Sequence, residues 1–405
     1  MKILQPYYYD DFKCSANGCI DTCCQGWKIP IDKKTFLKYK KLKGEFGKEI
    51  NKRIKRCRNE INDETYGELI KDEESKMCSF LTDEKLCGIY VEYGPEYMCN
   101  ICIDYPRIIE KYRFSNNESI IERNLASSCP DVVRQFLNNE RFSFTLKEEK
   151  INKSEIVTTI GDKGAEQFYN LLWQGRNFSI DIAQFREIPV WKRLVFIKIT
   201  EEKLQSLIDT REFSKADDII KSLRNEIIDP NVIDSLDKVS NINNIVKINL
   251  ISSVIRERAT KVVHAEKYRE MVSNLNELIN GKSDDELQLM LNEKRNEFDN
   301  YFKEKEHVLE NYIVYYLYRR YMSAIKNKNL SKEIANLMIN YSVIRLFLLA
   351  TWNKNNGKLT DEDIVDAIYS FSREIEHAGG LADALYNSMK VNGYDSIGYL
   401  VTMIY

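Results

Sequence analysis

The ten cysteines of this chain all lie within its first 129 residues, although the chain has 405 residues. Four of them fall inside one eleven-residue stretch, and two of these four are adjacent: Cys14, Cys19, Cys23 and Cys24. The other six follow at wider intervals: Cys57, Cys78, Cys87, Cys99, Cys102 and Cys129. Clustered thiols commonly bind metals, so this uneven distribution predicts a metal-binding first third.

The composition is that of a soluble globular protein, with 43% hydrophobic and 30% charged residues. The length predicts two or three domains with a sizeable core. The 60 basic and 62 acidic residues give a formal net charge of -2. Since no excess of positive charge is available to bind phosphates, nucleic-acid binding is disfavoured.

The apolar runs are far shorter than the roughly 20 residues that a membrane-spanning helix needs, so we expect no transmembrane segment. The N-terminus has neither the apolar core nor the small-residue cleavage site of a signal peptide. We therefore expect a cytoplasmic protein with reduced thiols. In that compartment, ten cysteines indicate metal or redox chemistry rather than disulfides.

Residues 1–140 contain five of the seven prolines together with all the cysteines, which predicts an irregular, cysteine-rich metal-binding domain. One amphipathic helix is expected from Lys33 to about Cys57, with Asp32 as its N-cap. Short strands are expected at 87–91 and 120–121. So little apolar surface is available there that a metal centre is expected to contribute to stability.

Residues 141–405 predict a multi-helix bundle, which makes the fold class mainly α. Apolar residues there recur at intervals of three and four, and no proline follows Pro230. Thr360 and Asp363 resemble an N-terminal capping arrangement. Helices are expected over 164–175, 189–209, 215–228, 243–277, 284–303, 308–321, 331–353, 360–377 and 381–404.

Spacing alone leaves the kind of metal site open. Thiolates suit both Zn²⁺ and iron–sulfur clusters. Only Cys99 and Cys102 have the Cys-x-x-Cys spacing of a zinc ribbon, so a simple ribbon fits poorly. The main radical enzymes that use S-adenosylmethionine have a Cys-x-x-x-Cys-x-x-Cys run, which is not present. The remaining alternative is that the cysteines are inert buried thiols.

The stretch from Phe12 to Trp27, FKCSANGCIDTCCQGW, resembles the opening signature of the flagellin lysine N-methylase family. Further elements match in order: CSFL and LCGI around Cys78 and Cys87, CIDYPR from Cys102, and SCPD around Cys129. Weaker likenesses continue to the Arg373–His377 stretch, so the resemblance spans nearly the whole chain. Eight cysteines occupy matching positions: Cys14, Cys19, Cys23, Cys24, Cys78, Cys87, Cys102 and Cys129.

This resemblance implies a methyltransferase that uses S-adenosylmethionine to modify lysines of flagellin and needs a [4Fe–4S] cluster. The eight matched cysteines are then the candidate metal ligands, and eight exceed the needs of one cluster. Cys57 and Cys99 do not match. We accordingly expect Cys57→Ser and Cys99→Ser to leave metal content unchanged, and Cys19→Ser or Cys102→Ser to lower it.

No glycine-rich S-adenosylmethionine motif is present, so we expect the cofactor between the cysteine domain and the bundle. Trp27 and Tyr105 are candidates to stack on adenine, and Arg107 is a candidate to pair with a carboxylate. A core aromatic and a structural ion pair are the alternative roles. Arg373 and His377 share a helix face and form a second candidate pair facing the cysteine domain. The alternative role of His377 is to cap the C-terminus of its helix before Gly379 and Gly380.

Two polar residues beside an apolar stripe, Glu310 and Asn311, are either functional or part of a buried interhelical contact. Two other functions remain open at this point. One is a non-catalytic zinc- or iron-binding module, and the other is an iron–sulfur electron-transfer protein.

Overall fold

The computed structural model describes the chain outside a set of short gaps. These gaps are residues 59–61, 74–75, 114–118, 150–157, 161–164, 237–244, 246–247, 250, 253–254, 256–257, 260–264, 378–380, 392, 394–395 and 405.

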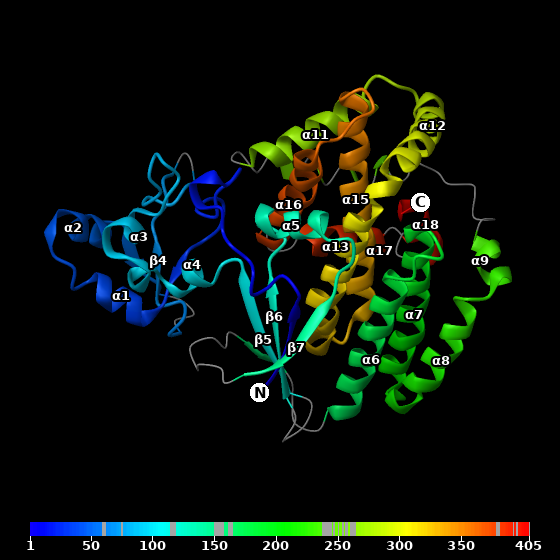
Figure 1. Cartoon of the computed structure of the whole chain (residues 1–405), viewed down its shortest axis with the longest axis horizontal. Helices are drawn as coiled ribbons and strands as arrows, with labels where there is room; N and C mark the ends of the chain where they lie inside the picture. Colours follow the sequence, from blue (N-terminus) through cyan, green and yellow to red (C-terminus); the bar gives the residue numbers. More distant parts are fainter. Residues whose placement is uncertain are drawn as a thin grey trace.

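The first 160 residues contain all the described strands and five short helices (Figure 1). In chain order they are β1 (Lys2–Pro6), β2 (Pro30–Ile31), α1 (Lys33–Tyr39), α2 (Gly44–Lys52), β3 (Ile54–Arg56), β4 (Gly67–Leu69), α3 (Gly88–Tyr93), α4 (Asn100–Asp104), β5 (Arg107–Arg113), β6 (Ser119–Leu125), α5 (Pro130–Asn138), β7 (Phe144–Glu148) and β8 (Thr158–Ile160).

The described elements after residue 165 are helical. They are α6 (Glu166–Ala183), α7 (Val190–Thr210), α8 (Ala216–Glu226), α9 (Pro230–Leu236), α11 (Glu266–Ile279), α12 (Asp284–Phe302), α13 (Glu306–Arg320), α14 (Ala324–Asn327), α15 (Leu330–Lys354), α16 (Asp361–His377), α17 (Leu381–Val391) and α18 (Ile397–Ile404). The prediction of a mainly α chain with a multi-helix C-terminal bundle is confirmed.

A five-stranded sheet in the order β7-β1-β6-β5-β8 joins the two halves of the chain. Strand β1 runs parallel to β6 and antiparallel to β7. Because β7 and β8 follow residue 140, the sheet contains residues from both sides of the expected domain boundary. Its side chains pack into the same hydrophobic core as the helices of the bundle. The division at 140 stays a prediction.

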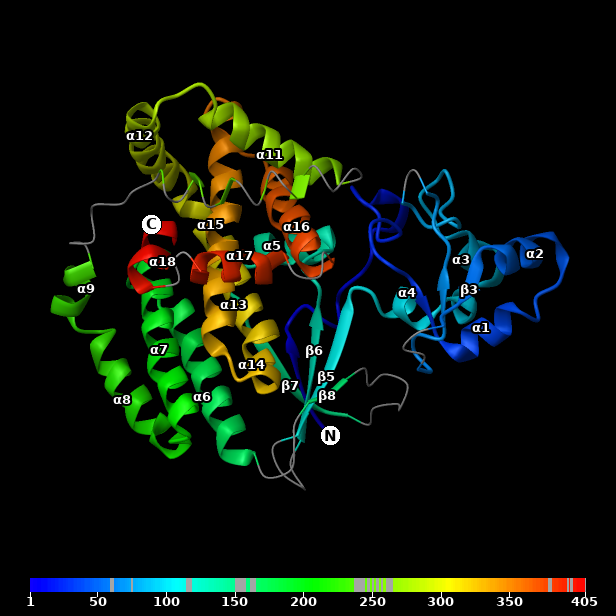
Figure 2. The same cartoon turned by 180° about the vertical axis from the view of Figure 1, so that it is seen from behind.

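The cysteine-rich part leaves the sheet after β1 and returns at β5. Figures 1 and 2 show it, in blue and cyan, on one side of the sheet, with the helical bundle on the other. It has a small hydrophobic core of its own, formed by residues between Ile29 and Cys102, and a three-stranded sheet in the order β2-β4-β3. Metal binding by this part stays a prediction.

Helix α15 forms the centre of the bundle (Figure 2). By length and composition it is apolar enough to cross a membrane, but 94% of its most apolar window is buried inside the fold. It therefore has the burial of a core helix, and the expectation of no transmembrane segment stays a prediction.

Gly175 allows α6 to lie close to its neighbours in the bundle. A Cβ atom at this position would lie 2.5 Å from both Leu204 Cδ1 of α7 and Tyr321 Oη. Contacts this short do not occur between real side chains, so only glycine fits there.

Two local predictions are wrong. The single helix expected over 33–57 is two helices followed by strand β3, because Gly44 adopts φ +83° and starts a new helix after a turn, and the helix ends at Lys52. The strand expected at 87–91 is helix α3, since a short apolar run does not distinguish strand from helix. The Asp32 N-cap is confirmed, as Thr35 N donates to Asp32 Oδ1 at 2.9 Å.

Two further predictions are confirmed. The strand expected at 120–121 is part of β6. Thr360 and Asp363 cap α16 reciprocally, with Asp363 N donating to Thr360 Oγ1 and Thr360 N donating to Asp363 Oδ2. Much of the helix expected over 243–277 falls among residues outside the described ranges.

Candidate functional site

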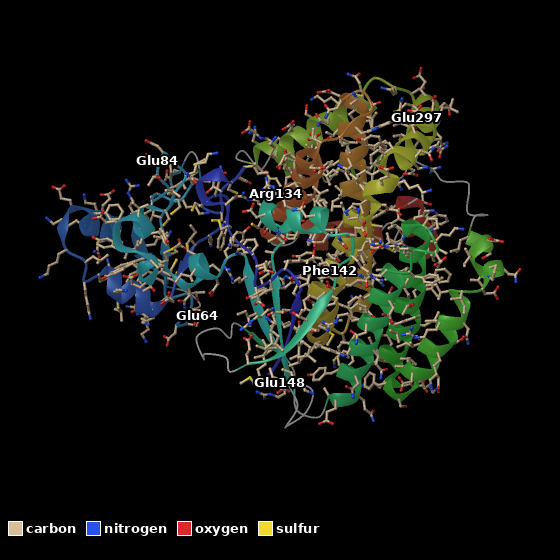
Figure 3. The ribbon with its side chains drawn as sticks, in the orientation of Figure 1. Glu64, Glu84, Arg134, Phe142, Glu148 and Glu297 are labelled. Carbon is tan, nitrogen blue, oxygen red and sulfur yellow. The ribbon has the colours of Figure 1, made fainter. Side chains whose placement is uncertain are left out.

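A cavity of about 340 Å³ brings together the site residues expected from the sequence. Figure 3 draws the side chains of this part of the molecule, with sulfur in yellow. The three expected cofactor-binding residues, Trp27, Tyr105 and Arg107, line this thiol cavity. Nine of the ten cysteines line it as well: Cys14, Cys19, Cys23, Cys24, Cys78, Cys87, Cys99, Cys102 and Cys129.

One group of five thiols lies on the side of the cavity toward the core of the cysteine-rich part. Within it the Sγ atoms of Cys99 and Cys102 are 3.3 Å apart. Electrostatic interactions link its members, which are Cys24, Cys78, Cys87, Cys99 and Cys102. We call these five residues the first thiol group.

The other four thiols form a second group, linked in the same way: Cys14, Cys19, Cys23 and Cys129. The loop that carries Cys14 is fixed to helix α5, since the backbone N and the hydroxyl of Ser15 both donate to Asp131 Oδ2, at 2.9 and 2.7 Å. Cys129 precedes the first turn of that helix. The adjacent Cys23 and Cys24 connect the two groups.

The thiol of Cys24 has a lowered pKa. The Cys23 thiol donates a hydrogen bond to it and lowers the pKa of Cys24 to about 7, with help from the Thr22 hydroxyl and the positive charge of Arg373. The same hydrogen bond, together with burial, raises the pKa of Cys23 above the ordinary range. Near neutral pH, the pair therefore holds one proton and one thiolate.

Three further thiols, Cys78, Cys102 and Cys129, keep their protons at neutral pH. Burial raises the pKa of Cys78 and of Cys129 to about 12. The pKa of Cys102 is raised well above its ordinary value, first by its hydrogen bond with Cys99 and then by burial. A metal that binds here has to displace these protons, so loading is expected to release protons and to depend on pH.

The donor chemistry of this cavity fits a metal held by thiolates, either an iron–sulfur cluster or Zn²⁺. Thiolates are the usual ligands of such clusters, and this cavity supplies nine thiols. Among the described residues, no three His, Cys, Asp or Glu side chains converge closely enough to hold one metal ion.

The rings of Trp27 and Tyr105 lie side by side, with centroids 5.9 Å apart and planes inclined by 34°. Trp27 Nε1 donates to Cys23 O at 2.7 Å, which ties the indole to the cysteine loop. Tyr105 and Ser128 share a hydrogen bond of 3.2 Å between their hydroxyls. The exposed Arg107 places its guanidinium 5.6 Å from the centre of the Phe12 ring.

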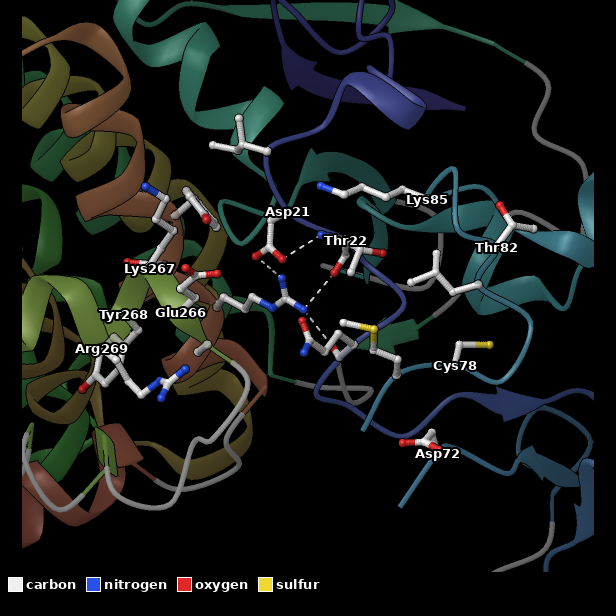
Figure 4. A pocket seen from close by; sticks show the side chains of 18 of the residues that line it. Asp21, Thr22, Asp72, Cys78, Thr82, Lys85, Glu266, Lys267, Tyr268 and Arg269 are labelled. Atoms are coloured by element: carbon white, nitrogen blue, oxygen red, sulfur yellow. Dashed lines mark hydrogen bonds and ion pairs between the residues drawn. The ribbon is translucent and has the colours of Figure 1, made fainter. Parts of the chain in front are cut away.

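A second, polar cavity of about 730 Å³ lies between the cysteine-rich part and the bundle. Figure 4 shows Glu266 and Lys267 of α11 on one side of it and Thr82 and Lys85 on the other. Its lining also includes Tyr369 and Ser370 of α16. The two cavities share a wall made of Asp21, Thr22, Cys78, Lys85 and Arg373.

Arg373 holds this shared wall in place. It reaches from α16 to the cysteine loop, where it forms an ion pair with Asp21 and donates to the carbonyl oxygens of Thr22 and Gln25, each at 2.8 Å. The sequence-based expectation that Arg373 faces the cysteine domain is confirmed. The side chain of its expected partner, His377, lies outside the described part of the structure.

Glu310 and Asn311 belong to the bundle instead. Glu310 is buried and paired with Arg193 at 2.6 Å and with Arg186 at 2.9 Å. Asn311 Nδ2 donates to the carbonyl oxygens of Phe136 and Asn139 at the end of α5. Their role is therefore a buried interhelical contact.

Sequence reasoning missed three residues of these cavities. Cys99 was set aside because it does not match the family motif, although its Cys-x-x-Cys spacing with Cys102 was the available signal. Tyr369 and Ser370 carried no signal, because they lie within an ordinary amphipathic pattern. Among the described residues, Cys57 is the one cysteine that lines neither cavity.

Comparisons with known proteins gave three kinds of match. The C-terminal domain model of the FliB lysine N-methylases matches residues 176–403, more than half of the chain. The flagellar biosynthetic protein FliU of Salmonella muenchen is 28% identical over 142 residues, which are 34% of this chain and 78% of that protein.

Two proteins named lysine-N-methylase, from Salmonella choleraesuis and Salmonella typhimurium, are each also 28% identical over 142 residues. The matched region is 34% of this chain and 33% of each of those proteins, so it spans about a third of their length. No solved structure gives a significant match.

Proposed function

Because this chain belongs to the FliB lysine N-methylase family, we propose that it transfers methyl groups from S-adenosylmethionine to lysine side chains of flagellin. The names of its relatives, lysine-N-methylase and flagellar biosynthetic protein, support this substrate. The observation that carries the proposal is the single cavity in which nine cysteines, Trp27, Tyr105 and Arg107 meet. The reaction takes place in the cytoplasm, where thiols stay reduced.

We propose further that thiols of this cavity hold a [4Fe–4S] cluster, with the first thiol group as its main source of ligands. Cys24 is the natural first ligand, because it is already a thiolate near neutral pH. If three thiolates of this cavity held the cluster, its remaining iron would be available to the amine and the carboxylate of a methionyl group. The second thiol group, which lies beside Asp131, is then not needed as the main source of cluster ligands.

The transfer itself requires a neutral lysine amine. The amine nitrogen forms a bond to the methyl carbon while the bond from that carbon to the sulfonium sulfur breaks, and the sulfur keeps the electron pair. The product ammonium then releases a proton to water or to a carboxylate. A lysine amine has an ordinary pKa of about 10.4, so the site has to favour its neutral form by desolvation.

The donor's adenine is proposed to lie against Trp27 and Tyr105. Two aromatic rings with a centroid distance of 5.9 Å, next to the thiols, offer a surface for stacking a planar base. Arg107, exposed at the rim of the cavity, can pair with a carboxylate once its guanidinium leaves the Phe12 ring.

Anaerobic purification followed by an activity assay tests the proposal. We expect a brown protein with about four irons per chain. Incubation with S-adenosylmethionine carrying a labelled methyl group is expected to place the label on flagellin lysines. Trp27→Leu should raise the KM for S-adenosylmethionine, whereas Cys57→Ser, a thiol outside the cavity, should behave like the unmodified protein.

Two results would reject parts of the proposal. A colourless protein that contains zinc alone would reject the cluster and favour a non-catalytic module in which zinc stabilises the fold. An intact cluster with no label on lysine would reject the methylase activity and favour electron transfer.

A further inference from the structure

The net charge of -2 conceals a strongly basic segment that runs from Lys33 to Arg58. This segment has twelve basic and two acidic residues, so it carries a charge of +10, and the other residues of the chain together carry -12. It contains α1, α2 and β3. Figures 1 and 2 show α1 and α2 at the end of the cysteine-rich part farthest from the bundle. We call residues 33–58 the basic end.

Most of the positive charge at the basic end is exposed and has no acidic partner. Ten of the twelve basic side chains are exposed, and the other two, Lys38 and Arg53, are half-buried. Four of the twelve form ion pairs, with Glu49, Asp63 or Glu68. Positive charges this dense create a potential that attracts anions. Among the described residues, eight basic side chains have no ion pair: Lys34, Lys38, Lys40, Lys41, Lys43, Lys48, Arg56 and Arg58.

An exposed apolar side chain, Leu37, lies in the middle of these charges. Leu37 is 46% exposed, whereas its neighbour Phe36 and the nearby Tyr39 are buried in the small core. Residues three and four positions away on a helix share its face, and at Leu37 all four of these are lysines. A face that combines lysines with an exposed leucine is typical of a helix that lies on a membrane surface. The four lysines are Lys33, Lys34, Lys40 and Lys41.

The composition of the basic end favours a membrane over other anionic partners. Nine of its twelve basic residues are lysines, which bind phosphate as point charges, whereas bases and acidic motifs are read mainly by the planar fork of arginine. Its three aromatic side chains, Phe36, Tyr39 and Phe46, are buried or half-buried, so none offers an exposed ring on which a base could stack. None of its lysines lines the thiol cavity or the polar cavity, so the lysines form an open surface outside both.

We propose that the basic end docks the protein on a lipid membrane that carries anionic headgroups. The lysine ammonium groups pair with the phosphate oxygens of the lipids, and Leu37 enters the boundary between headgroups and acyl chains. The rest of the molecule, with its charge of -12, is repelled by the same surface. Attraction at one end and repulsion elsewhere orient the protein, so the bundle points away from the membrane.

Vesicle sedimentation with the full-length protein, purified anaerobically, tests this inference. The two probes are vesicles of phosphatidylcholine alone and vesicles that also contain about 30% phosphatidylglycerol, an anionic lipid. We expect binding to the anionic vesicles to be at least about tenfold tighter at low salt. This preference should shrink as the salt concentration rises, because exposed charges are screened.

Neutralising three lysines around Leu37 should weaken this binding strongly. Each lysine near an anionic surface contributes about a fivefold change in affinity, so the triple variant Lys34→Gln, Lys40→Gln, Lys41→Gln should bind anionic vesicles about thirtyfold to hundredfold more weakly. Leu37→Ser should weaken binding about threefold to tenfold, and this loss should persist at high salt because it does not depend on charge.

Each variant has a matched control outside the basic end. The triple variant Lys221→Gln, Lys282→Gln, Lys303→Gln removes the same charge from three other exposed lysines, and Leu289→Ser removes a leucine of α12 that is 72% exposed. Both controls should bind anionic vesicles like the unmodified protein. Urea unfolding of all four variants should match that of the unmodified protein, because the replaced side chains are exposed.

The inference is overturned if the protein binds both kinds of vesicle equally, or if the control triple variant loses as much binding as the triple variant of the basic end. Tighter binding to a single-stranded RNA oligonucleotide than to anionic vesicles would assign the basic end to nucleic acid and would also overturn it. The proposed function is tested separately, because methyl transfer to soluble flagellin is measured without vesicles.

Discussion

Arg373 forms an ion pair with Asp21, a residue 352 positions earlier in the chain. The same guanidinium donates to two carbonyl oxygens of the loop that carries Cys23 and Cys24. The bundle therefore fixes the conformation of the cysteine loop directly, and both cavities depend on this contact.

Replacing Arg373 should weaken the fold and change the chemistry of Cys24. Arg373→Gln removes a largely buried charge together with its bonds to Asp21, Thr22 and Gln25, so the free energy of unfolding should fall by about 2–4 kcal/mol. The pKa of Cys24 should rise toward its ordinary value, because the positive charge of Arg373 helps to lower it. Urea unfolding and thiol titration measure these effects.

A suitable control for that variant is Arg258→Gln, which breaks the neighbouring ion pair with Glu374 on α16. It should destabilise the bundle without moving the pKa of Cys24. Equal shifts of the pKa in both variants would mean that Arg373 acts only through overall stability.

In the metal-free protein, Cys24 should be alkylated at lower pH than Cys19, Cys23, Cys78, Cys87, Cys102 or Cys129, whose pKa values are raised. Its pKa is lowered from 9.0 to about 7, so the rate of reaction with iodoacetamide should rise through a midpoint near pH 7. Because the folded pKa lies below the ordinary value, the thiolate adds stability above pH 9, and this stability is lost as the pH falls through about 7. Mass spectrometry of peptides modified between pH 5 and 10 measures the midpoint for each cysteine.

The hydrogen bond from Cys23 can be tested in the same experiment. Cys23→Ala removes the donor that contributes most to the lowered pKa, so the Cys24 midpoint should move upward. A Cys24 midpoint near pH 9 in the unmodified protein would contradict the described thiol pair.

Variants of Cys99 and Cys57 test whether the structure or the family motif predicts the metal ligands correctly. The motif predicts that neither residue affects metal content. The structure places Cys99 Sγ 3.3 Å from Cys102 Sγ in the thiol cavity and leaves Cys57 outside it. We therefore expect Cys99→Ser to lower the iron content by half or more, as Cys102→Ser does, and Cys57→Ser to leave it unchanged.

Iron and zinc analysis of the anaerobically purified variants shows which of these cysteines is needed for metal binding. Full iron content in Cys99→Ser would mean that the metal ligands come from the eight motif positions and that Cys99 is not one of them. Comparing Cys78→Ser with Cys14→Ser in the same series would then show which thiol group holds the metal.

Glu310→Gln should destabilise the bundle strongly. The substitution leaves the buried guanidinium of Arg193 without its closest carboxylate, which typically costs about 3–5 kcal/mol. Glu306→Gln is the matched control, because Glu306 is more exposed and lies 3.8 Å from the same arginine. It should change the free energy of unfolding by less than about 1 kcal/mol. Chemical denaturation of both variants tests the difference.

The helices were the part of the fold that the sequence predicted well, since a period of three to four apolar residues is a local signal. The sheet was not predictable in this way. Strand β1 pairs with β6 and β7, about 120 and 140 residues away, and such pairings depend on the register of distant segments. The break at Gly44 was also missed, because a single glycine within a charged amphipathic run is compatible with a continuous helix.

The candidate site was predicted only in part, because local motifs are visible in the sequence and the packing of distant segments is not. The cysteine motif indicated which thiols belong together, and Trp27, Tyr105 and Arg107 do line the cavity with them. The motif did not indicate that Cys99 joins them, that the thiols divide into two groups, or that a polar cavity lies behind the Arg373 wall. Each of these depends on packing between segments that are far apart in the chain.

The insertion of the cysteine-rich part between β1 and β5 has a consequence for synthesis on the ribosome. Strand β1 pairs with β6, which precedes Cys129, and with β7, which follows it, so the sheet is complete only after the last cysteine has been made. Until then the ten thiols belong to an open chain, exposed to metals and oxidants. If the proposed metal centre needs the complete sheet, its assembly would follow long-range strand pairing.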